Sequence, residues 1–368
     1  MKHLFNFLHR VTLFFLLFFS PSLLLASENE TTHNAEKKFN AGEMIMEHII
    51  DAHEWHMMEV GETAIVLPLP IILFDEGKIV TFCSSKFHHG KDAYKGYKLE
   101  TEGAYKGKIV KVDENGQHIQ NAKLPLDLSI TKNTLSLFIS LTLLCIIFLY
   151  VAKCYKRNPK EAPKGFQNMI EYLILFIRND VVKPSIGKKY EKYLPFLLTL
   201  FFFIFFSNLL GIVPFFPGGV NLTGNIAITM VLALFTFVII LFSGNKNYWL
   251  HIVNTPGVPW WLKIPLPLMP IVEIIGVITK PFVLMVRLFA NITAGHIIIL
   301  GFIGLIFIFG NINIGAGFGV SIVSVIFAVF MGILELLVAF LQAYVFTLLS
   351  SLYFGMALEE HQHVEEHS

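Results

Sequence analysis

Five long apolar segments dominate the last two thirds of this chain, and they restrict what it can fold into. Each is close to, or longer than, the ~20 residues that a helix needs to cross the hydrocarbon core of a bilayer. They occupy residues 135–152, 194–213, 225–242, 269–309 and 320–353. Hydrophobic residues make up 54% of the chain, more than the ~45–50% of soluble domains. The sequence therefore predicts an all-α polytopic membrane protein with about five membrane helices.

The last two segments are too long to cross a membrane upright. At ~1.5 Å per residue, helices over residues 269–309 and 320–353 exceed the ~30 Å core. We therefore expect both to tilt strongly or to lie partly in the membrane plane. A turn near residues 315–319, at the exported surface, would make these two helices antiparallel.

The N-terminus has the pattern of a secretory signal peptide over residues 1–26. Lys2 and Arg10 precede an apolar run that ends at the small residues Ala26 and Ser27. The same residues could instead form an uncleaved first membrane helix, because the run is just long enough to span. Either reading places the residues that follow outside the cytoplasm.

Residues 27–131 are polar and mixed, and they predict a small β-rich exported domain after a short helix. Strand-like runs at residues 63–74 and 106–112 are each followed by a turn sequence. His53 and His56 could lie one helical turn apart, as metal ligands sometimes do. No further ligand beyond nearby His48 has matching spacing, so a solvated amphipathic helix is favoured. The sequence indicates no metal site and no cofactor.

The loop at residues 153–164 sets the expected orientation. It carries five Lys or Arg residues against one Glu, so the positive-inside rule places it in the cytoplasm. Residues 168–184 then have the pattern of an amphipathic helix on the cytoplasmic surface. The membrane domain is expected over residues 132–358, and the polar tail at residues 359–368 is expected in the cytoplasm.

Ionisable residues interrupt the apolar segment at 269–309. Glu273, Lys280 and Arg287 are seven residues apart, and each such step drifts only ~20° around a helix, so the three share one face. Asn291 follows Arg287 by one turn and joins that face. A charge at this depth costs ~2.5–3.5 kcal/mol on insertion scales, so it marks a functional site by default.

The last segment carries a second polar pair, Glu335 and Gln342, again seven residues apart. In an antiparallel pair of helices, Arg287 lies level with Gln342. His296 then lies level with Glu335, and it is rotated about half a revolution away from Arg287. An imidazole and a carboxylate at matched depth suit a proton path. The pairs could instead only lock the helices together, but a whole stripe of polar residues favours transport.

Arg287 cannot carry protons, since guanidinium stays charged at ordinary pH. It is suited to be a fixed positive charge that attracts a carboxylate. Glu273 is ~21 Å away along the same helix, so it cannot neutralise Arg287. The predicted counter-charge therefore lies on another protein.

The stretch PIVEIIGVITKPFVLMVRLFANITAGH, residues 270–296, resembles the signature of the a subunit of the membrane sector (Fo) of bacterial rotary ATP synthases. The resemblance covers about residues 130–360. It implies a non-enzymatic, proton-translocating stator subunit in the bacterial inner membrane. The implied partners are the ring of c subunits, the subunit b stalk, the rest of the F-type synthase and membrane lipid, with no nucleic acid. In this family, protons reach and leave the ring carboxylates through two offset half-channels.

The same resemblance implies roles for individual residues. Arg287 resembles the essential stator arginine, and Asn291 its neighbour on the helix. Gln342 resembles a glutamine that packs close to that arginine. Glu273 resembles the acidic residue of the cytoplasmic half-channel, and Asn208 a polar residue that lines the half-channel open to the exported side.

His296 and Glu335 resemble two coupled positions of that exported-side half-channel, in the reverse order of the best-known enterobacterial members. Lys280 joins the candidate proton path by its place on the polar face. Gly211 departs from the family, because some members have an acidic residue there.

A proton- or cation-coupled secondary transporter is the alternative function. Against it, the sequence has no repeated halves and no paired short broken helices. A standalone channel fits less well, because a lone fixed arginine would oppose cation flow. A third alternative is a membrane scaffold for the exported domain.

Overall fold

The computed structural model describes residues 42–358, apart from residues 43–44, 47–48, 61–62, 89, 102, 114–115, 120–121, 158, 214–217 and 254–267. The chain divides into residues 1–39 and residues 40–368, and all that follows concerns the second unit. The expected signal peptide, His48 and the polar tail lie outside the described residues.

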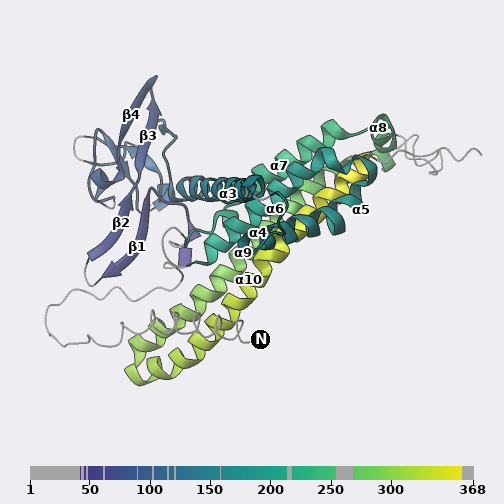
Figure 1. The fold of residues 1–368 in the computed structure, drawn as a ribbon. Coiled ribbons are helices and arrows are strands. Elements are labelled where there is room, and N and C mark those ends of the chain that lie inside the picture. The colour runs from purple at the N-terminus through teal and green to yellow at the C-terminus, as the bar shows by residue number, and fades with distance from the viewer. Residues whose placement is uncertain are drawn as a thin grey trace, which may run out of the picture. The chain divides into compact units, whose positions relative to one another are not determined.

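The described residues of the N-terminal part form seven short strands in three antiparallel sheets (Figure 1). β1 and β2 form one sheet, β4, β3 and β7 the second, and β5 and β6 the third. The strands are β1 Glu54–Val60, β2 Thr63–Pro68, β3 Pro70–Asp75, β4 Lys78–Cys83, β5 Tyr97–Leu99, β6 Ile109–Lys111 and β7 Leu126–Asp127. The expected strands at residues 63–74 and 106–112 are present, but the first is divided at Leu69.

The β3–β4 hairpin shows how local sequence determines this region. Asp75 pairs with Lys78, which leaves Glu76 and Gly77 as a two-residue turn. Both have positive φ, 47° and 81°, as a type I′ turn requires. The buried sides of β3 and its neighbours contribute to a small core of Ile71, Leu73, Phe87, Tyr97 and Ile109.

The expected helix through His53 and His56 is wrong. β1 begins at Glu54, and its backbone pairs with β2 in the register His56 opposite Val66. His53 is buried, and its Nε2 lies 2.7 Å from Oδ2 of Asp127 on β7. The spacing of the two histidines only weakly favours a helix, and pairing with the apolar strand β2 stabilises the extended conformation instead.

The rest of the described chain is helical (Figure 1). Five helical stretches are long and apolar enough to cross a membrane: residues 132–157, 166–212, 226–243, 271–312 and 314–358. The helices are α3 Lys132–Arg157, α4 Phe166–Phe176, α5 Lys183–Ile186, α6 Tyr190–Ile212, α7 Ile226–Ser243, α8 Lys246–Val253, α9 Leu268–Ile312 and α10 Ile314–Leu358, with a π-helical stretch, Ile177–Val182, between α4 and α5. The polytopic helical fold class is thus confirmed.

α9 and α10 form a hairpin whose turn is Asn313. This turn lies two residues before residues 315–319, near which it was expected, and those residues belong to α10. The Asn313 side-chain oxygen accepts a hydrogen bond from the Gly315 N–H at 2.8 Å and so starts the new helix. A Cβ on Gly317 would lie 2.8 Å from Cα of Gly310, so this glycine allows a close approach of the two helices.

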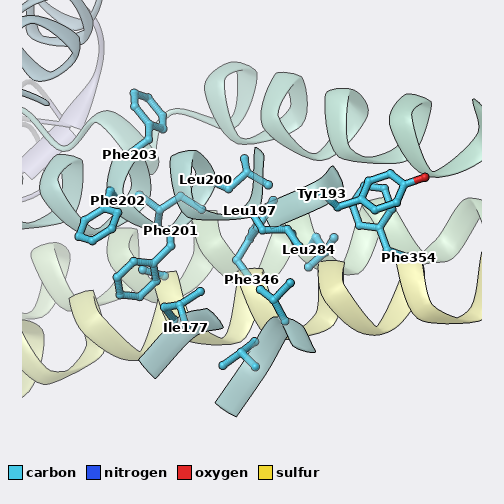
Figure 2. Close-up of a cluster of buried hydrophobic side chains, with 14 of the residues drawn as sticks. Ile177, Tyr193, Leu197, Leu200, Phe201, Phe202, Phe203, Leu284, Phe346 and Phe354 are labelled. Carbon is cyan, nitrogen blue, oxygen red and sulfur yellow. The ribbon is translucent and has the colours of Figure 1, made fainter. Parts of the chain in front are cut away.

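The helical core is built by α6, α10 and the segment from α4 to α5, with contributions from α7 and from Leu284 of α9 (Figure 2). Leu197, Phe201 and Phe202 of α6 are fully buried, and Phe201 meets Phe340 of α10 edge to face at 6.0 Å. Ile177 and Val181 are also fully buried, so residues 168–184 are helical as expected but also pack into this core. Gly187, with φ 73°, separates this segment from α6.

Candidate functional site

His296 of α9 and Glu335 of α10 face each other. Nδ1 of His296 lies 3.6 Å from Oε1 of Glu335, within ion-pair range but longer than a hydrogen bond. Glu335 is only 6% exposed although it is ionisable. Gly295 lies against the carboxylate, since a Cβ at this position would be in ordinary van der Waals contact with Oε1 of Glu335 at 3.6 Å.

Asn208 of α6 is buried and is held by two hydrogen bonds. Its Nδ2 donates to the carbonyl oxygen of Ala339 at 3.3 Å, and its Oδ1 accepts from the hydroxyl of Thr223 at 2.6 Å. Ala339 follows Glu335 by one turn of α10. Hydrogen bonds therefore join the loop before α7, through Asn208 of α6, to the α10 backbone one turn from Glu335.

Thr223 was not expected from the sequence. It belongs to a short 3-10 helix, Leu222–Gly224, and is fully buried. A single threonine after a loop rich in Pro and Gly has no spacing that marks it. Its role depends on a contact between segments 15 residues apart, which one sequence cannot reveal.

Arg287 is exposed on the outside of the helical bundle. Leu284 and Leu288 of the same helix are buried, whereas Arg287 and Asn291 both point outward. Among the described residues, no carboxylate forms an ion pair with Arg287. An exposed arginine in a membrane-spanning helix needs a counter-charge.

Gln342 of α10 is buried. Within the part of the chain that the structure describes, no hydrogen bond joins Gln342 to Arg287. That Gln342 and Arg287 lie at the same depth in the membrane stays a prediction.

Glu273 and Lys280 lie on the other side of Arg287 along α9, and both are half-buried. Nζ of Lys280 lies 5.4 Å from the ring centroid of Tyr353 on α10. Lys280 and Tyr353 line a narrow pocket between α7, α8, α9 and α10, together with Thr236 and Tyr248. Arg287 is ~21 Å from Glu273 and ~13.5 Å from His296 along the helix, so it separates two polar clusters.

Outside the membrane helices, the pKa values of two carboxyl groups, Asp75 and Asp127, are lowered. The hydrogen bond from Lys111 holds the pKa of Asp75 below its ordinary value of 3.8. Burial acts to raise the pKa of Asp127, but hydrogen bonds from His53 and Ser129 outweigh it and keep that pKa low. No group of three or more His, Cys, Asp or Glu side chains in the described ranges could hold a metal ion.

The fold and this arrangement define a class of protein, a multi-pass membrane protein with polar clusters inside its helical bundle and an exposed arginine between them. Residues 134–355 match the family model described as ATP synthase A chain. This chain belongs to that family. It is a non-catalytic, proton-translocating subunit of the F-type ATP synthase of bacterial type. A second model, a domain of unknown function, matches residues 44–128, which contain the seven strands.

Named relatives agree with this membership. ATP synthase subunit a of Chloroherpeton thalassium is 45% identical over 247 residues, which cover 65% of this chain and 70% of the relative. ATP synthase subunit a 2 of Chlorobaculum tepidum is 48% identical over 237 residues, 63% of this chain and 64% of the relative. ATP synthase subunit a of Myxococcus xanthus is 43% identical over 250 residues, which cover 66% of this chain and 77% of the relative.

Proposed function

We propose that this chain carries protons to and from a rotating ring of c subunits through two separate half-channels, with Arg287 facing the ring carboxylates. One observation carries the proposal: Arg287 is exposed on the bundle surface, without a carboxylate partner among the described residues, between two polar clusters. A secondary transporter would instead place such a charge in an enclosed site between repeated halves.

The half-channel open to the exported side is assigned to Asn208, Glu335 and His296. The buried pair offers two groups that accept and release protons, and the Asn208 amide lines the approach. Thr293 Oγ1 and Ser207 Oγ are buried without a partner among the described residues. Buried hydroxyls of this kind suit a path that contains water.

Arg287 acts on the ring by electrostatics. A neutral ring carboxylate that arrives beside Arg287 is stabilised in its charged form, so its proton is released. The released proton leaves through the second cluster, past Lys280 and Glu273. Asn291 and Gln342 are expected to position the arginine.

The orientation and partners belong to the same proposal. The loop at residues 153–164 and the tail lie in the cytoplasm, and the strand-rich part, residues 27–131, lies on the exported side after a signal peptide over residues 1–26. The c-ring contacts the Arg287 face, and the subunit b stalk binds elsewhere on the membrane domain.

The test is ATP-driven proton pumping in membrane vesicles that contain the assembled complex. Arg287→Ala should abolish pumping and raise the passive proton leak, because nothing then keeps the two half-channels apart. Arg157→Ala, which removes an exposed arginine at the end of α3, serves as the control and should pump normally. Normal pumping by the Arg287→Ala complex would sink the proposal.

A further inference from the structure

A second polar crevice lies where the start of α6 and the ends of α7 and α10 meet. It has a volume of about 570 Å³. Its lining includes Lys188, Lys189, Lys192, Phe242, Asn245 and Leu358. No residue of the proposed proton path lines it, so the crevice needs another explanation.

The crevice is positively charged. Three of its lining residues are lysines, and all three are exposed, whereas Glu191 is the one acidic residue in the lining. Lys189 makes a further contact, and Nζ of Lys192 lies 5.4 Å from the ring centroid of Tyr193, which lines the same crevice. The argument therefore rests on Lys188 and on Lys192 in that position. The first N–H groups of α6 add a partial positive charge at the same place.

One wall of the crevice is apolar. Phe242, in the last turn of the membrane-spanning helix α7, is 89% exposed, so its ring is accessible to a lipid chain. The wall is held in place at its base, because the Asn245 N–H donates to the Ala357 carbonyl at 3.0 Å. The Asn245 side chain donates to the Leu358 carbonyl, also at 3.0 Å. The ends of α7 and α10 are therefore fixed together, and the crevice is preformed.

We propose that this crevice binds the phosphate headgroup of an anionic phospholipid, with an acyl chain against Phe242. The helices that form it end at the membrane surface, where basic pockets between helices bind such headgroups. A phospholipid has both parts that the crevice matches, an anion for Lys188 and Lys192 and an apolar chain for Phe242. In the proposed orientation, the lipid belongs to the cytoplasmic leaflet. The site does not depend on the proton path.

The experiment uses the assembled synthase in detergent with phosphatidylglycerol that carries a photoreactive group in one acyl chain. After irradiation, lipid adducts on the peptide that contains Phe242 are quantified by mass spectrometry. We expect the Lys188→Gln, Lys192→Gln double variant to lose adduct roughly 25-fold, about fivefold for each lysine near an anionic lipid. The matched control, Lys156→Gln with Lys160→Gln, removes two cytoplasmic lysines away from the crevice and should form adduct normally.

Two further arms distinguish lipid from other anions. Inorganic phosphate should not compete with the lipid for the crevice. The Lys188→Arg, Lys192→Arg double variant keeps both positive charges and should retain the adduct, and it tests the proposal even where the double Gln variant does not assemble. Equal adduct in the double Gln variant, loss of adduct in the Arg variant, or competition by inorganic phosphate would each overturn the proposal. So would adduct that forms only after removal of residues 359–368, because the acidic tail would then be the occupant.

Discussion

Two polar regions of α9 differ in what surrounds them. His296 is turned inward and faces buried Glu335. One turn further along α10, the backbone carbonyl of Ala339 accepts a hydrogen bond from Asn208 of α6. Arg287 and Asn291 are turned outward and exposed. A charge in a membrane must be compensated, and this chain completes the inward region itself. In the proposed function, another protein completes the outward region. The predictions below test that division, from the largest expected effect to the smallest.

Glu335→Gln tests whether the inward pair moves protons. The amide cannot exchange a proton, so we expect both driven and passive proton flux to fall ~100-fold, the lower end of what a positioned acid–base group contributes. Flux is measured in vesicles over a wide pH range. The swapped variant, His296→Glu with Glu335→His, keeps both groups and should recover part of the flux. Unchanged flux in Glu335→Gln would remove the pair from the path.

Thr223→Val tests the hydrogen bonds that extend the inward region. The variant keeps the shape of the side chain but removes the hydroxyl that donates to Asn208 Oδ1. Interhelical hydrogen bonds of this kind contribute ~0.6–2 kcal/mol, so we expect flux to fall only a few-fold and the complex to assemble. Thr229→Val is the control, because its hydroxyl bonds only to backbone within its own helix region. Equal flux in both variants would show that Thr223 is not part of the path.

Acid should affect the strand-rich part before the helices. Asp75 and Asp127 have pKa values below 3.8, so their stabilising contacts are complete above that pH and are lost as the pH falls through the lowered values. After correction for the intrinsic pH dependence of amide exchange, we expect hydrogen exchange at β3 and β7 to be constant from about pH 5 to 8 and to rise relative to α9 below about pH 4. His53→Gln should raise the exchange at β7. A rise that begins near neutral pH would show that other groups control this part.

Much of the helical fold could be predicted from sequence, because each long apolar run has few alternatives in a bilayer. The expected segment at residues 269–309 became α9, Leu268–Ile312, and the segment at residues 225–242 became α7, Ile226–Ser243. The α9–α10 turn was misplaced because glycine marks both turns and close helix contacts, and here Gly317 serves the second purpose.

The candidate site could be predicted only in part. Helical spacing was enough to place His296 and Glu335 in one cluster, since both lie on regular helices. Thr223 was missed because its contact joins a loop to α6, and no periodic pattern reports such a contact. The His53–Asp127 contact was missed for the same reason, since it joins residues 74 apart in the chain.

The most direct test of the outward face is a disulfide between this chain and the c-ring. In a chain whose Cys83, Cys145 and Cys154 are replaced by Ser, Asn291→Cys is paired with a cysteine placed near the ring carboxylate. We predict rapid crosslinking at the exposed position 291 and none with Ile292→Cys, whose side chain is buried one residue further on. Crosslinking of Ile292→Cys but not of Asn291→Cys would contradict the claim that the Arg287 face meets the ring.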